Sequence, residues 1–280
     1  MGKFSRTWQL MGASWRLLKQ DKGLVVFPLL SGVVLALVIA SFAIPLFGTG
    51  TQHYLNAANR NNPGFYAGVF LFYFVNYFVL IFFNSALIAC VLKQMAGGEP
   101  TLRYGLRYAW QRLPQIFAWA LLTSTVGFVL RLIEGRVGFI GRIIVSVLGM
   151  AWAITSFLVV PVLVAEGKGP IDAYKQSVTM FKRTWGEQII GNVSFGLIFL
   201  LLGVMPMVVV ILLGLMVNPV LLLVIVPVAV IYVIALALIQ STLQTIYQVA
   251  IYRYATDGRA PDGFDDHLIA ESFRLKKNKN

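Results

Sequence analysis

The chain has 280 residues, of which 58% are hydrophobic and 12% are charged, whereas soluble domains have roughly 45–50% and about 25%. This composition is typical of an integral membrane protein and leaves no room for a large soluble domain. The formal net charge of +12 fits basic residues placed between membrane spans better than nucleic-acid binding, so we expect no nucleic-acid partner. Cys90 is the single cysteine, which excludes a disulfide within the chain and a cysteine-based metal site.

The first predicted element is an amphipathic helix over about 4–20. Its apolar residues recur at steps of three and four, which places them on one helical face, and Lys19 lies at the edge of that face. A basic amphipathic helix with tryptophans is typical of a segment that lies on a membrane surface. Spans of about 24–46 and 65–91 follow, and each exceeds the roughly 20 apolar residues that a bilayer crossing needs.

A second amphipathic helix is predicted over about 101–113, where Pro100 suits a helix start because its backbone angle is already helical. The basic residues around its apolar stripe are Arg103, Arg107 and Arg112. Spans of about 114–132 and 143–165 come next, and a short charged turn joins them. This turn holds Arg131, Glu134, Arg136 and Arg142. It is either a site for an anionic headgroup or a solvated turn with one ion pair.

A third amphipathic helix is predicted over about 170–186, and its stripe runs from Ile171 to Trp185 at helical spacing. Its flanking basic residues are Lys175, Lys182 and Arg183. The apolar region that follows is too long for one crossing. We expect two spans, about 189–217 and 220–247, with a turn at Asn218-Pro219, and then a tail over 261–280.

Together these elements predict an all-α fold: a polytopic membrane helical bundle of six transmembrane helices in three hairpins, with cytoplasmic amphipathic helices. If the amphipathic helices and both chain ends share one side, 19 of the 23 Lys and Arg residues lie there. The positive-inside rule then places both ends in the cytoplasm of a bacterial inner membrane or an equivalent bilayer. Each hairpin starts on the same side, so an internal repeat about an axis along the membrane normal is expected.

We expect no catalytic residues, no metal site and no cofactor. The two histidines, His53 and His267, fall on opposite sides of the predicted bilayer and cannot share a metal or a catalytic dyad. No ionisable side chain lies near the middle of a predicted span, which argues against an ion-coupled pump. The chain is therefore expected not to be an enzyme.

Two sets of residues are candidates for binding. One is a set of polar residues within spans, which could line a polar cavity or hold helices together by hydrogen bonds; its members are Asn76, Asn84, Gln240, Gln244 and Gln248. The other is the basic set of the amphipathic helices, which could contact anionic lipid headgroups or only brace the hairpins. Its members are Lys19, Arg103, Arg107, Arg112, Lys175, Lys182 and Arg183.

Several separated segments resemble a family of bacterial six-span membrane proteins of unknown activity. These segments are DKGLVVFPLLSG, FFNSALIACVLK, GEPTLRYGLRYAWQRL, MFKRTWGEQIIGN and IYRYATDG. The layout is more distantly similar to the membrane domain of some glycerophosphoryl diester phosphodiesterases, although nothing after Tyr254 could form their catalytic barrel. The resemblance implies a fold and a membrane location, and it brings no catalytic residues.

The expected function is that of a non-catalytic protein that organises the membrane or binds lipids or a membrane-protein partner. The alternative is a transporter or channel for a neutral or lipid-like small molecule. A continuous cavity that reaches the asparagines or the glutamines would favour transport, and a tightly packed core with exposed basic helices would favour a scaffold.

Overall fold

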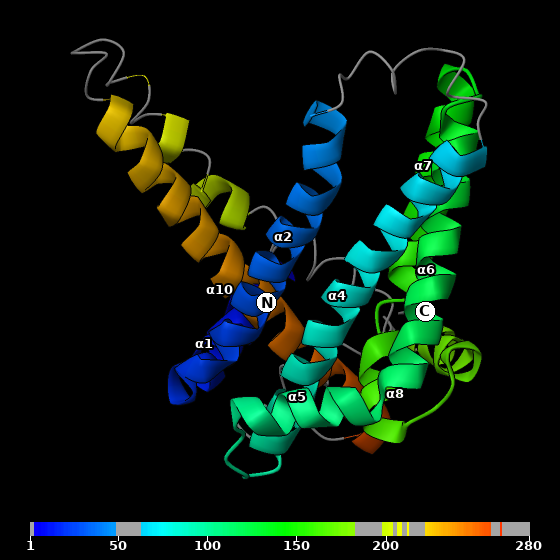
Figure 1. The fold of residues 1–280 in the computed structure, drawn as a ribbon. Coiled ribbons are helices and arrows are strands. Elements are labelled where there is room, and N and C mark those ends of the chain that lie inside the picture. The colour runs from blue at the N-terminus through cyan, green and yellow to red at the C-terminus, as the bar shows by residue number, and fades with distance from the viewer. Residues whose placement is uncertain are drawn as a thin grey trace, which may run out of the picture.

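The computed structural model describes residues 3–48, 63–182, 198–203, 206–208, 212, 222–258 and 264, and within these ranges it contains helices and no strands. Figure 1 shows long helices that run side by side, with shorter helices across one end. The helices are α1 (Lys3–Gln20), the short 3-10 helix η1 (Lys22–Val25), α2 (Val26–Gly48), α4 (Pro63–Met95), α5 (Leu102–Gln111), α6 (Leu113–Glu134), α7 (Phe139–Thr155), α8 (Val159–Glu166) and α10 (Leu222–Asp257). Residues 170–182 are also helical.

Five of the described segments are long and apolar enough to cross a membrane. They are Lys22–Ile44, Pro63–Met95, Leu113–Glu134, Phe139–Glu166 and Ile225–Asp257. Each overlaps a predicted span, so an all-helical, multi-pass architecture is confirmed. The predicted span over 189–217 lies mostly outside the described residues, although 198–203 and 206–208 within it are helical. Six spans and the hairpin layout therefore stay predictions.

Helix α4 is the centre of the bundle. It packs against α2, α5, α6, α8 and α10, and every residue from Ser85 to Val91 is buried. A helix that is apolar all round fits a position where neighbouring helices or lipid cover all its sides.

Helix α5 crosses α4 at very short range. A methyl group on Gly105 would lie 2.7 Å from Cys90 Sγ and 2.7 Å from the Phe27 ring. Ala109, one turn further along α5, is fully buried. Small residues at this spacing let two helices approach closely, as is common inside membrane bundles. The start of α5 is fixed by Thr101, whose hydroxyl accepts a hydrogen bond from the backbone N–H of Tyr104 at 3.1 Å.

The amphipathic helices contact the bundle through small residues and through some larger ones, among them Leu17 and Leu18 of α1. Ala109 of α5 is buried, whereas Trp110 is 67% exposed. Over 170–182, Ala173 is buried and Ile171 is exposed. The predicted apolar stripes include several of these bulky exposed residues. Part of each stripe therefore contacts the bundle, where small residues such as Ala109 and Ala173 let the helices approach closely.

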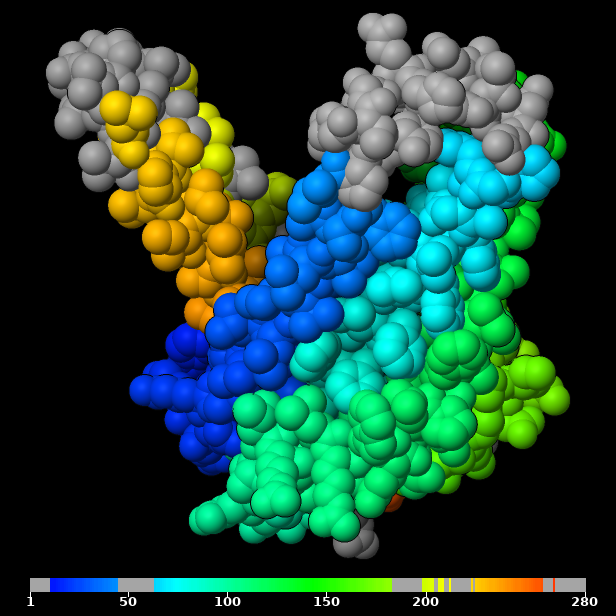
Figure 2. Space-filling view, viewed as in Figure 1, coloured from blue at the N-terminus to red at the C-terminus, as the bar shows by residue number. Residues whose placement is uncertain are grey.

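Helix α10 leans away from the rest of the molecule along its first half. Its buried residues gather near its end, where it packs against α1, α4 and α8. Leu223, Val228 and Ile231, nearer its start, are exposed. The space-filling view in Figure 2 shows an open wedge between this half of α10, in orange and yellow, and α2, in blue.

Candidate functional site

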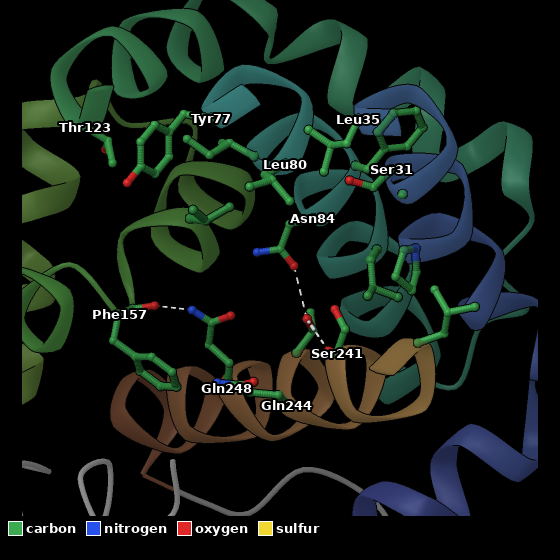
Figure 3. A pocket seen from close by; sticks show the side chains of 18 of the residues that line it. Ser31, Leu35, Tyr77, Leu80, Asn84, Thr123, Phe157, Ser241, Gln244 and Gln248 are labelled. Carbon is green, nitrogen blue, oxygen red and sulfur yellow. Dashed lines mark hydrogen bonds between the residues drawn. The ribbon is translucent and has the colours of Figure 1, made fainter. Parts of the chain in front are cut away.

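A cavity of about 600 Å³ lies among the membrane helices (Figure 3). Its walls come from α2, α4, α6, α10 and the junction between α7 and α8. This volume is within the range of cavities that hold small molecules, roughly 300–1,000 Å³. Most of the wall is apolar, with Leu35, Leu80 and Leu238 among the lining residues, and none of the described lining residues is charged. The cavity therefore suits an uncharged, largely apolar ligand.

Asn84 of α4 projects into this cavity toward α10. The hydroxyl of Thr245 lies 3.1 Å from the Asn84 side-chain oxygen and 3.0 Å from the backbone carbonyl of Ser241, so its single proton is shared between two acceptors. The amide nitrogen of Asn84 takes no part in this contact and points into the cavity in Figure 3. Asn84 thus joins α4 to α10 through its oxygen and presents its nitrogen to the cavity.

The fourth predicted span is broken inside the membrane region. Helix α7 ends at Thr155 and α8 begins at Val159, although 143–165 was predicted as one helix. Pro161 supplies the reason, because it has no N–H to donate to the carbonyl four residues earlier, which is that of Phe157. A helix with this carbonyl left unpaired in an apolar environment would lose stability.

Side chains from other helices satisfy the backbone groups at the break. The side-chain nitrogen of Gln248, on α10, donates to the Phe157 carbonyl, which replaces the donor that proline lacks. Ser177, in the 170–182 helix, accepts from the backbone N–H of Leu158 at 3.1 Å and donates to the carbonyl of Thr155 at 2.7 Å. The amphipathic helix and α10 therefore hold the broken span from two sides, beside the cavity.

Two hydroxyl groups that line the cavity have no hydrogen-bond partner within the described structure. They belong to Ser31 of α2, which is 6% exposed, and Thr123 of α6. Several other hydroxyls in the membrane helices donate to the carbonyl three or four residues earlier, as Ser41 does to Val38 at 2.7 Å and Thr125 to Leu121 at 2.7 Å. Ser85 of α4, which does not line the cavity, is also buried without a partner in the described structure. Buried polar atoms are rarely left unpaired. A ligand in the cavity would supply the missing partners.

Three of the five polar candidates line the cavity: Asn84, Gln244 and Gln248. Asn76 and Gln240 do not. The amide of Asn76 donates to the Phe72 carbonyl of its own helix at 2.7 Å. Ser31 and Thr123 were missed by the sequence reading, since a lone hydroxyl in an apolar helix usually bonds to its own backbone and gives no signal of a site.

The basic candidates of α1 and α5 lie at the end of the bundle that these two helices share (Figure 1). Lys19 is exposed, and its ammonium lies 5.7 Å from the centre of the Trp15 ring. Arg103 and Arg107 are exposed on α5. Arg112 is only half-exposed, and its guanidinium lies 5.7 Å from the centre of the Tyr108 ring.

In the third amphipathic helix, Lys175 and Lys182 are exposed. The ammonium of Lys175 lies 3.9 Å from a carboxylate oxygen of Asp172. Arg183 lies outside the described residues. In the last turn of α6, Arg131 and Glu134 form an exposed ion pair at 3.6 Å, a type that contributes little to stability in water.

Five long apolar helices and a cavity with an uncharged wall fit one class of protein, the multi-pass helical membrane protein. Residues 64–264 match a family of unknown function, DUF6159, and the chain belongs to that family. The matched region starts at α4 and includes every wall of the cavity except α2. The curated proteins and the solved structures gave no match.

Proposed function

We propose that the protein is not an enzyme and that it binds and transports a neutral, lipid-like molecule through the cavity between α2, α4, α6, α8 and α10. The observation that carries this proposal is the cavity itself, which reaches Asn84, Gln244 and Gln248 and has no charged residue among its described lining. An ionised ligand would have to leave water without a counter-charge, which is costly in an apolar environment. Between the two expected functions, the cavity favours transport over a scaffold.

The route into the cavity is from the side, through the membrane. Leu35 of α2 and Leu238 of α10 both line the cavity, and the wedge between these helices is open in Figure 2. The lining residues of α6, Trp119 and Thr123, come about 9–15 Å after its start at 1.5 Å per residue. The cavity therefore lies in the half of the bundle near α1 and α5. By the distribution of basic residues this half belongs to the cytoplasmic leaflet, and a lipid of that leaflet would enter sideways.

Native mass spectrometry of the detergent-extracted protein tests this proposal. Gly32 lines the cavity, and a methyl group built on it meets no atom within 4 Å, so the backbone accepts a side chain there and Gly32→Leu is expected to fill part of the cavity. We expect the variant to lose most of a co-purifying lipid-like molecule. Gly68→Leu is the matched control, since Gly68 also has open space around it but does not line the cavity. Equal ligand retention in both variants would refute the proposal.

A second function, contact with anionic lipids, is favoured by the exposure of Lys19, Arg103 and Arg107 at one end of the bundle. Each basic residue near an anionic leaflet contributes on the order of 1 kcal/mol, and the exposed Lys182 would add to this surface. Replacing Arg103 and Arg107 by glutamine should reduce retained phosphatidylglycerol, more strongly at low salt. If the amount of retained phosphatidylglycerol does not change, these residues do not bind anionic lipid and only support the packing of the hairpins.

We further propose that the whole chain has six spans in three related hairpins, in a bacterial inner membrane, with both ends in the cytoplasm. The span over 189–217 would supply the sixth crossing.

A further inference from the structure

The 170–182 helix holds two parts of the cavity wall although it does not line the cavity itself. No residue of this helix is among the described lining residues. We infer that Tyr174 and Ser177 are positioning residues for the cavity, through which the position of this surface helix sets the affinity of the cavity for its ligand. This inference rests on the proposed function, because it concerns how the same cavity is controlled.

The first contact is with the break between α7 and α8. Ser156 and Phe157, which form this break, line the cavity. Ser177 is buried and bonds to the residue on either side of them: it donates to the carbonyl of Thr155 at 2.7 Å and accepts from the N–H of Leu158 at 3.1 Å. A hydroxyl can do both at once, because it has one donor and two acceptor positions. Ser177 therefore fixes both ends of this part of the wall.

The second contact is a stack of three aromatic rings. The ring of Tyr174 stacks on that of Trp152, of α7, with 5.2 Å between the ring centres. Trp152 stacks in turn on Trp119, of α6, at 5.8 Å. Trp119 is 3% exposed and lines the cavity. Because packed rings interdigitate without gaps, one ring cannot shift unless its neighbours shift with it. Tyr174 therefore fixes a second part of the wall.

Both contacts lie on one face of the surface helix. Tyr174 and Ser177 are three residues apart, a spacing that places side chains side by side on a helix, and Ala173 beside them is fully buried. Lys175 is exposed. A displacement of the helix would thus disturb both parts of the wall together. Coupling between two places in a protein is reciprocal, so a ligand that fits the wall should also stabilise the helix.

Native mass spectrometry of the full-length protein in detergent tests this inference, with monoolein as an uncharged, single-chain probe. Tyr174→Leu removes one ring from the stack, and we expect it to weaken monoolein binding about three- to tenfold, the range of one aromatic contact. Tyr174→Phe keeps the ring, and the Thr155 hydroxyl keeps the Ala151 carbonyl as its acceptor at 2.8 Å, so this variant should bind monoolein as the parent does. Tyr108→Leu is the matched control, since Tyr108 contacts Tyr104 on another surface helix and neither lines the cavity. It should leave the affinity unchanged.

Hydrogen exchange gives a readout that a purely structural role of Tyr174 would not produce. Monoolein should slow the exchange of the backbone amides of 170–182 in the parent protein, although the helix does not line the cavity. The same amides should respond less in Tyr174→Leu. Gly32→Leu, treated with monoolein in the same detergent, should show no such protection, because its cavity is partly filled.

The inference is overturned if Tyr174→Leu binds monoolein as tightly as the parent, or if monoolein leaves the exchange of 170–182 unchanged. If Tyr174→Leu does not fold, the exchange measurement on the parent protein decides alone. Gly32→Leu separates this failure from that of the proposed function. If Gly32→Leu weakens the binding and Tyr174→Leu does not, the cavity binds lipid-like molecules without control by the surface helix. If the parent does not bind monoolein, or if Gly32→Leu binds it equally, both proposals fail.

Discussion

Gln248 completes a backbone hydrogen bond that Pro161 cannot make. Proline removes the donor for the carbonyl of Phe157, and the Gln248 side chain donates to that carbonyl from another helix. Ser177 supplies two further bonds at the same break. A break of this kind in the middle of a membrane span survives only where protein groups replace the missing bonds.

Replacing Gln248 by leucine should destabilise the protein. The substitution keeps the size of the side chain and leaves the Phe157 carbonyl without a donor, at a cost of about 1–3 kcal/mol. Gln240→Leu is the matched control, because Gln240 stands two turns earlier on α10 and does not line the cavity. Thermal unfolding in detergent, followed by circular dichroism, should give a lower midpoint for Gln248→Leu alone. Equal midpoints would mean that the Gln248 bond adds nothing to stability.

The sequence identifies Gln248 as a candidate residue but does not identify its hydrogen-bond partner, the Phe157 carbonyl. Three glutamines at four-residue spacing predict one polar stripe on a helix, and that stripe is compatible with a cavity or with helix contacts. Its bond goes to a backbone carbonyl 91 residues earlier in the chain, which no local pattern encodes. Ser31 and Thr123 are still harder to predict from the sequence, because they stand out only by having no hydrogen-bond partner in the described structure.

At the scale of elements, the crossing of α5 over α4 depends on Gly105. A methyl group there would lie 2.7 Å from Cys90 Sγ and 2.8 Å from the backbone carbonyl oxygen of Ala86. The carbonyl belongs to the central helix and cannot move aside as a side-chain end can. The position of α5 is therefore set by contact between backbones.

Gly105→Ala should destabilise the protein, although alanine is the better helix former by about 1 kcal/mol. The clash with α4 costs typically 1–3 kcal/mol and outweighs that gain. Gly12→Ala in α1 is the opposite case, since nothing lies within 4 Å of the added methyl group, and it should leave the unfolding midpoint unchanged or raise it. Thermal unfolding of the two variants under the same conditions shows whether each substitution raises or lowers the unfolding midpoint. A midpoint for Gly105→Ala at or above that of the parent would contradict the close packing.

Sequence patterns predicted the type and approximate bounds of most described elements. Long apolar runs identified five spans, because length and hydrophobicity alone decide whether a helix can cross a bilayer. They did not locate the break between α7 and α8, since Val, Leu and Ile continue on both sides of it. The apolar stripes predict helices on a membrane surface but do not show which of their residues contact the bundle: Ala109 belongs to the stripe of 101–113 and is buried, whereas Trp110 of the same stripe is exposed.

At the scale of the whole molecule, the basic residues of α5 and the turn between α6 and α7 lie at opposite ends of the helical bundle. α5, with Arg103 and Arg107, lies across one end of the bundle, and the turn between α6 and α7 lies at the other end (Figure 1). The α6 helix alone, with 22 residues, separates these ends by about 33 Å at 1.5 Å per residue, which matches the thickness of the hydrocarbon core.

Cysteine labelling should therefore place Arg107 and Arg136 on opposite sides of the membrane. Both positions are exposed, and the native Cys90 is buried, so the parent protein provides a background without labelling. We expect Arg136→Cys to react with a membrane-impermeant maleimide in intact cells whose outer membrane admits the reagent. Arg107→Cys should react only after the inner membrane is permeabilised, because the positive-inside rule keeps the basic end in the cytoplasm. If Arg107→Cys reacts with the reagent from outside, the protein has the opposite orientation. If both variants react from the same side, α6 does not cross the membrane.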